Sequence, residues 1–213
     1  SSPNTSPQRV IENFARSVYP TLVKSRVATG STPPSAETDY FNGGDINWFT
    51  PGDFDRSIEL KASRRQIRQD AVETGICKLF PKGTVYLVGI GATLGKVAVS
   101  DVESSANQQL NAILTNDYTD PYFVAYFLHS FRTEVRVASN ANTIGILNQD
   151  GTKSILMPVP PQSDQSKIAS ILKEYDEKEC VVVNRIQKSI QRLQEYRSAL
   201  ITAAVTGQLS DLR

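Results

Sequence analysis

The chain has 213 residues, of which 39% are hydrophobic and 21% charged, a composition typical of globular proteins. Its formal net charge is only +1, with 15 basic and 15 acidic side chains in residues 1–160 and 8 and 7 in residues 161–213. Composition therefore does not point to nucleic acid, and a DNA-binding role would require the fold to sort basic groups onto one face.

Several other classes of protein fit the sequence poorly. No apolar run approaches the ~18–20 residues of a membrane span, and polar residues 1–9 are not followed by the apolar segment of a signal peptide. One histidine and two distant cysteines, Cys77 and Cys180, argue against a zinc site. We expect two free thiols in a reducing cytoplasm, and no metal.

The sequence predicts a globular α/β (α+β) domain over residues 10–160, preceded by a disordered lead-in over residues 1–9. Runs rich in β-branched and aromatic residues predict strands at residues 84–90, 96–100, 111–115 and 154–160. The first two, joined by a glycine-rich turn, are expected to form a hairpin. Asp120 and Pro121 begin a predicted apolar helix that continues to His129.

Residues 161–213 have a different pattern, which predicts one long helix. Residues 163–204 contain neither glycine nor proline, and Gly207 is a candidate C-cap. Apolar residues recur at heptad spacing, with two polar exceptions at Glu179 and Ser189. A helix of ~40 residues is ~60 Å long, and an apolar stripe of that length needs a partner helix. The predicted interface residues are Ile168, Leu172, Tyr175, Val182, Ile186, Leu193, Tyr196 and Leu200, with Ala203 at the end of the stripe.

None of the motifs predicts catalysis. The sequence from Gly89 to Lys96 lacks the glycine spacing of a phosphate loop, and Val97 stands where the Mg²⁺-binding hydroxyl would be. It also has one residue too many for a dinucleotide-binding loop and leads into a strand. Residues 120–123 lack the second proline of a DNA adenine methyltransferase loop, and the acidic residues are too scattered for a nuclease. We predict no catalytic residue and no cofactor.

Two stretches are candidates for contact with DNA. Lys61, Arg64, Arg65 and Arg68 form a basic run suited to phosphates, although residues 53–73 hold five basic and five acidic side chains, which also fits a solvated face. Asn107 and Gln108 carry amides that can pair with adenine, although amides at a strand edge often satisfy backbone groups instead. The turn that ends at Lys96 is a third candidate, because glycines there allow close approach to a ligand.

The order of several short motifs resembles the specificity subunits of type I restriction–modification enzymes over about residues 27–209. Each motif is weak alone, and their order and spacing carry the resemblance. One departure is Gln162-Ser-Asp, which stands where Leu-x-Glu is commoner before Gln165. The motifs are residues 29–34, 40–48, 80–85, 91–98, 107–109, 142–148, 158–165 and 197–207.

The resemblance implies a non-catalytic subunit in a half-length form, with one target-recognition domain and one long helix. It would be either a natural half-subunit or the carboxy-terminal half of a longer subunit that has two of each. The domain would read one half of a split double-stranded DNA site, and Ser31, Thr32 and Thr93 join the candidate contacts because they lie in matching motifs. The helix would form an antiparallel homodimer and dock methyltransferase subunits and, through them, the ATP-dependent restriction subunit, in a bacterial or archaeal cytoplasm and without a membrane. The alternative is a dimeric coiled-coil adaptor whose globular domain binds protein.

Overall fold

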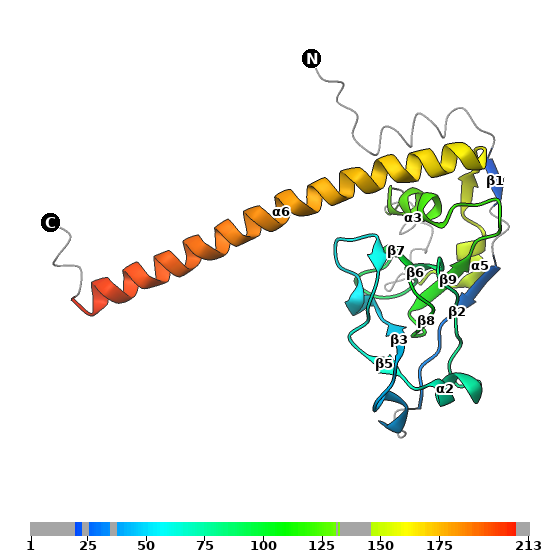
Figure 1. Cartoon of the computed structure of the whole chain (residues 1–213), viewed down its shortest axis with the longest axis horizontal. Coiled ribbons are helices and arrows are strands. Elements are labelled where there is room, and N and C mark those ends of the chain that lie inside the picture. Colours follow the sequence, from blue (N-terminus) through cyan, green and yellow to red (C-terminus); the bar gives the residue numbers. More distant parts are fainter. Residues whose placement is uncertain (1–19, 23–25, 35–37, 131, 133–145, 208–213) are drawn as a thin grey trace, which may run out of the picture. The chain divides into compact units, whose positions relative to one another are not determined.

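The structure, a computed structural model, describes residues 20–22, 26–34, 38–130, 132 and 146–207 (Figure 1). The expected lead-in at residues 1–9 lies outside them. The chain divides into two compact units, Ser1–Leu172 and Lys173–Arg213. The division falls twelve residues after the expected boundary at residue 160, because the first turns of the long helix are packed into the core of the first unit.

A five-stranded sheet forms the centre of the first unit. Its strand order is β2-β9-β6-β7-β4, with all neighbours antiparallel except β7 and β4, which are parallel. The predicted hairpin is confirmed as β6 and β7, and the predicted strand at residues 111–115 is β9. The strands are β2 (Arg26–Thr29), β9 (Leu110–Leu114), β6 (Val85–Val88), β7 (Val97–Ser100) and β4 (Glu59–Leu60).

Two smaller sheets and short helices complete this unit. The three-stranded sheet has the order β5-β3-β8, in which β3 is antiparallel to β5 and parallel to β8. The α+β class is therefore confirmed. The remaining elements are β1 (Pro20–Leu22) paired with β10 (Leu156–Pro158), β3 (Ile46–Phe49), β5 (Gln66–Ile67), β8 (Ser104–Ala106), η1 (Thr38–Phe41), η2 (Pro51–Asp53), α2 (Gln69–Glu73), α3 (Pro121–Ser130) and α5 (Gln149–Lys153).

The predicted strand at residues 154–160 is shorter than expected and follows a helix that the sequence did not indicate. Helix α5 begins after Asn148, whose side chain accepts a 2.8 Å hydrogen bond from the Gly151 amide. This cap stabilises a short helix in spite of Gly151 within it. Only residues Leu156–Pro158 are extended, as β10.

Helix α6 (Gln162–Val205) has 44 residues and lies within the predicted range of residues 161–213. Gln165, on its first turn, is completely buried. Its Oε1 accepts from the Asp120 amide at 2.8 Å, and its Nε2 donates to the carbonyls of Tyr118 at 3.1 Å and Pro160 at 2.8 Å. One amide thus satisfies three backbone groups where α3 begins and the strand before α6 ends.

Two predicted interface residues are in the core instead. Ile168 and Leu172 are 5% and 2% exposed and pack in one cluster with α3 and the central sheet. They share the heptad stripe with the rest of the helix, but their apolar surface is already covered within the first unit. Their assignment to a helix–helix interface is corrected on this ground.

Candidate nucleic-acid interface

The glycine-rich segment after β6 forms a compact turn that closes the hairpin. Gly95 donates to the Val88 carbonyl at 2.9 Å, and Lys96 donates to the Thr93 carbonyl at 3.0 Å. Gly91 and Gly95 have φ angles of 94° and 81°, which favour glycine over any residue with a Cβ. Gly91 is exposed and Thr93 half-buried, so the turn presents backbone to the solvent.

The amide segment lies beside this turn, but its three side chains have different roles. Asn107 is 9% exposed, accepts from the Gln109 amide at 3.1 Å and donates to Gln109 Oε1 at 3.0 Å. Gln108 and Gln109 are exposed, and the Gln109 carbonyl accepts from the Gly89 amide at 2.8 Å. Asn107 therefore shapes the turn, which corrects its assignment as a base reader. Gln109 is an exposed amide of the motif at residues 107–109 that was not named among the candidate contacts.

Ser31 and Thr32 lie against the same segment. Ser31 donates its amide to the Ala106 carbonyl at 2.7 Å, and its own carbonyl accepts from Trp48 Nε1 at 2.9 Å. The Thr32 hydroxyl donates to Gln108 Oε1. The Ser31 hydroxyl oxygen accepts from the Lys78 backbone amide at 3.0 Å, so its side chain also serves a structural contact, whereas Thr32 orients an exposed amide.

Gly30 allows this close approach, and we predict that Gly30→Ala disrupts it. A Cβ at residue 30 would lie 2.2 Å from the Asn107 carbonyl oxygen, and backbone must move to relieve the clash. We expect a loss of about 1–3 kcal/mol in the free energy of unfolding, typical of overpacking. Urea denaturation measures this loss. Gly52→Ala is the control, because its Cβ would meet only ordinary contacts at 3.5 Å or more; equal losses in the two variants would contradict the prediction.

The basic run does not form one patch. Lys61 pairs with Glu59 at 3.3 Å, and Glu59 also accepts from the Tyr122 hydroxyl of α3 at 2.9 Å. Burial first, and then the hydrogen bond and charge of Glu59, raise the pKa of Tyr122, so the hydroxyl remains a donor. Arg68 pairs with Asp70 at 2.8 Å. Both cations are thus balanced by a carboxylate.

Arg64 and Arg65 differ from those two. The Arg65 guanidinium lies 3.6 Å from the centre of the Phe41 ring and 5.7 Å from that of Trp48. Such stacking holds the exposed guanidinium in place without neutralising it. The Arg64 side chain makes no ion pair with any residue that the structure describes, and its backbone amide donates to Asp53 Oδ1 at 2.8 Å.

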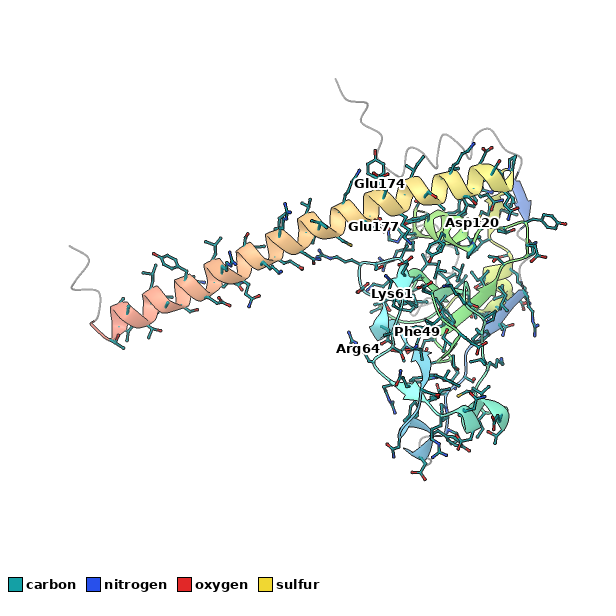
Figure 2. The ribbon with its side chains drawn as sticks, viewed as in Figure 1. Phe49, Lys61, Arg64, Asp120, Glu174 and Glu177 are labelled. Atoms are coloured by element: carbon teal, nitrogen blue, oxygen red, sulfur yellow. The ribbon has the colours of Figure 1, made fainter. Side chains whose placement is uncertain are left out.

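The segment after β3 connects these groups. The carbonyl of Phe49, the last residue of β3, accepts from the backbone amide of Asn107 at 3.0 Å. The Asp53 carboxylate accepts from the backbone amide of Arg64, and the Phe54 carbonyl accepts from Lys96 Nζ at 3.2 Å. Figure 2 shows Phe49 inside the domain and Arg64 at its surface. We call the exposed or half-buried side chains so connected the polar surface: Thr32, Arg64, Lys96, Gln108 and Gln109.

Other candidate chemistry is not supported by side-chain geometry. Cys77 is 2% exposed, and burial raises the pKa of its thiol in spite of hydrogen bonds to Ser31 and Ser105. Among the described residues no three His, Cys, Asp or Glu side chains gather as metal ligands. None of the described helices combines the length and the apolar character that a membrane span requires.

In the second unit, the predicted stripe on α6 is exposed. The exposed fractions are 44% for Tyr175, 54% for Val182, 53% for Ile186, 67% for Leu193 and 64% for Tyr196, and 37% for Leu200. A row of large apolar side chains this exposed is typical of an interaction surface.

The fold is that of an α+β domain followed by a long helix, with a polar surface and an apolar stripe. Residues 23–192 match the family described as Type I restriction modification DNA specificity domain, and the chain belongs to this family.

Individual relatives share part of the sequence. The chain is 32% identical over 156 residues to the specificity subunit of type I restriction enzyme MjaIX of Methanocaldococcus jannaschii, covering 71% of this chain and 35% of that subunit. Identity to the EcoR124I/EcoR124II specificity subunit of Escherichia coli is 25%, over 79% of this chain and 42% of the relative. The chain spans less than half the length of these two relatives.

Solved structures share the fold. The HsdS subunit from Thermoanaerobacter tengcongensis superposes with a TM-score of 0.57 over 87% of this chain and 43% of its own, at 20% identity. A chain from a study of complex assembly and conformational transition of the type I R-M system gives 0.68 over 92% and 52%, at 17% identity. At these identities the likeness concerns the fold alone, and it includes the long C-terminal helix.

Proposed function

We propose that this chain is a non-catalytic subunit that selects the DNA sequence at which a type I restriction–modification complex acts. Membership of the specificity-domain family is the observation that carries the proposal. The polar surface supports it, because it combines exposed amides with two cations that pair with no carboxylate among the described residues. Such amides suit base edges, and such cations suit phosphates. Arg64 and Lys96 would hold the backbone, and Gln108 and Gln109 would reach bases.

The proposal extends to assembly and partners. The exposed stripe on α6 would pair with a second copy, and an isologous dimer presents two identical readers in opposite directions. Its DNA site would be a split inverted repeat. Methyltransferase subunits for adenine methylation and, through them, the restriction subunit for cleavage would bind this dimer in the cytoplasm.

Phosphate and base contacts predict different effects on duplex binding. Arg64→Ala and Lys96→Ala should weaken binding to every sequence and reduce the slope of log affinity against log salt by about 1 for each phosphate that is no longer bound. Gln108→Ala or Gln109→Ala should cost about 1–3 kcal/mol and relax preference at one base position. Fluorescence anisotropy over a salt series, with duplexes randomised one position at a time, measures both effects.

Lys82→Ala is the matched control, because it removes one positive charge at the other end of the β6–β7 hairpin, where Lys82 pairs with Asp101 at 2.8 Å. Its effect on affinity should stay within about twofold, as for an exposed ion pair. A wild-type protein without any salt-dependent duplex affinity would instead favour the adaptor, whose domain binds protein.

A further inference from the structure

The exposed part of the stripe on α6 has defined limits, which constrain how two copies can pair. It begins at Tyr175, because Ile168 and Leu172 are buried, and its last large residue is Leu200. Between these limits the heptad pattern gives eight seam positions: Tyr175, Glu179, Val182, Ile186, Ser189, Leu193, Tyr196 and Leu200.

In a two-fold symmetric, antiparallel pair of helices, the seam residues of one copy must contact the seam residues of the other. The registers that allow this differ from one another by whole heptads. Three registers keep a substantial overlap. In them Tyr175 faces the partner's Leu193, Leu200 or Gly207. The choice among these registers decides which residues touch.

We propose that α6 pairs with a second copy in the register that sets Tyr175 against the partner's Leu200, a refinement that rests on the homodimer proposed above. This register uses the exposed stripe from end to end, and it sets Val182 against the partner's Leu193. With Tyr175 against Leu193, Leu200 would need Ile168, which is only 5% exposed. With Tyr175 against Gly207, Tyr175 would meet no side chain.

The polar seam position Glu179 argues against the register shifted toward Gly207 and fits the proposed register. In it Glu179 faces the partner's Tyr196, whose hydroxyl can donate to the carboxylate while its ring stays in the seam. Both residues are exposed in the single chain, so both are available. In the register shifted toward Gly207, Glu179 faces Ala203, which offers a carboxylate nothing.

One flank of the seam consists of the residues that directly follow every second seam position: Asp176, Val183, Ile190 and Arg197. This flank is self-complementary in the proposed register. Asp176 then faces the partner's Arg197, and Val183 faces Ile190, each pair occurring twice by symmetry. A shift by one heptad either way sets one of the two charges against an apolar side chain: Asp176 against Ile190, or Arg197 against Val183. Charge complementarity therefore selects the same register as the overlap does.

The opposite flank of the seam consists of the residues that directly precede Glu179, Ile186, Leu193 and Leu200. It carries Lys178, Arg185, Arg192 and Ala199. In the proposed register Arg185 faces the partner's Arg192, twice, and Lys178 faces Ala199. The like charges are exposed and cost little, but they provide a sharp test. In the shifted registers Arg185 faces either itself or Ala199, so reversing its charge would gain no opposite-charge pair.

Charge reversals measured by sedimentation equilibrium at low salt test the register. R185E and R192E should each tighten the dimer roughly 5- to 30-fold, because each turns two like pairs into two opposite pairs. The double variant R185E/R192E should return to within a few-fold of the wild-type dissociation constant.

The pair of Asp176 and Arg197 is tested in the same way. D176R should weaken the dimer, and D176R/R197D should restore it. The control K188E, with the same charge change away from the seam, should stay within about twofold. Tightening by only one of R185E and R192E would overturn the register.

Disulfide trapping gives a second readout. In a C180S background, Y175C/L200C should form a covalent dimer under mild oxidation. Y175C alone and L200C alone should not, because residue 175 lies far from the partner's residue 175, and residue 200 far from the partner's residue 200. Cross-linking of Y175C/L193C or V182C/L200C instead would overturn the register but would still support the homodimer. A wild-type monomer at micromolar concentration would overturn the homodimer itself.

Discussion

Aspartate at both Ile186 and Leu193 will convert the proposed dimer into a monomer of 23.5 kDa. The two side chains are 53% and 67% exposed in the single chain and would be covered in the pair. Each buried, unpaired carboxylate costs several kcal/mol, and two-fold symmetry doubles the number, so the dissociation constant should rise by about 1,000-fold or more. Light scattering across a concentration series measures the mass.

The matched control introduces the same two charges off the stripe. Val181 and Ile201 are 51% and 52% exposed, and neither lies at a seam position. V181D/I201D also tests whether aspartate simply weakens the helix, because aspartate is a poor helix former at either pair of positions. Dissociation of both double variants alike would contradict the assignment of the stripe.

The second large effect concerns Gln165, whose loss should destabilise the domain by about 3 kcal/mol or more. Gln165→Ala leaves the Asp120 amide and the carbonyls of Tyr118 and Pro160 without their present partner and opens a cavity. Gln165→Met keeps most of the volume and should recover the cavity contribution only. Urea unfolding, with an unchanged m-value, measures the loss.

Gln162→Ala serves as the comparison, because this glutamine lies one turn earlier on the same helix and donates to the Asp117 carbonyl at 2.9 Å from an exposed position. Its loss should cost less than about 1 kcal/mol, since water replaces an exposed partner. A similar loss for Gln162 and Gln165 would mean that burial of the amide contributes nothing.

Local patterns predicted the elements whose stability is local. Helix α6 and the β6–β7 hairpin were predictable because the absence of glycine and proline, and a turn between β-branched runs, act within a few residues. The parallel pairing of β3 with β8 was not predictable in this way. It joins segments more than fifty residues apart, and it is the contact that places Trp48 against Ser31.

The candidate DNA contacts were identified by residue type, and residue type does not specify exposure. Asn107 and Gln108 are neighbours with the same amide group, yet the first shapes a turn and the second is exposed. The four basic residues at 61–68 diverge because two of them meet nearby carboxylates, as the equal number of acidic residues in that stretch indicated. The heptad stripe likewise could not reveal that Ile168 and Leu172 serve the core and Leu193 does not.

The burial of the first turns of α6 fixes where such a domain can be exchanged between proteins. A natural cut point in the sequence is the proline-rich stretch at residues 158–161, but a chimera joined there would take Gln165, Ile168 and Leu172 from a foreign helix. The transplanted domain would then meet side chains that did not evolve with its core, which tolerates little change in volume. Recombination after Leu172 keeps the core intact and changes only the exposed helix. For the proposed choice of target, the unit to exchange is therefore the domain together with the first turns of its helix.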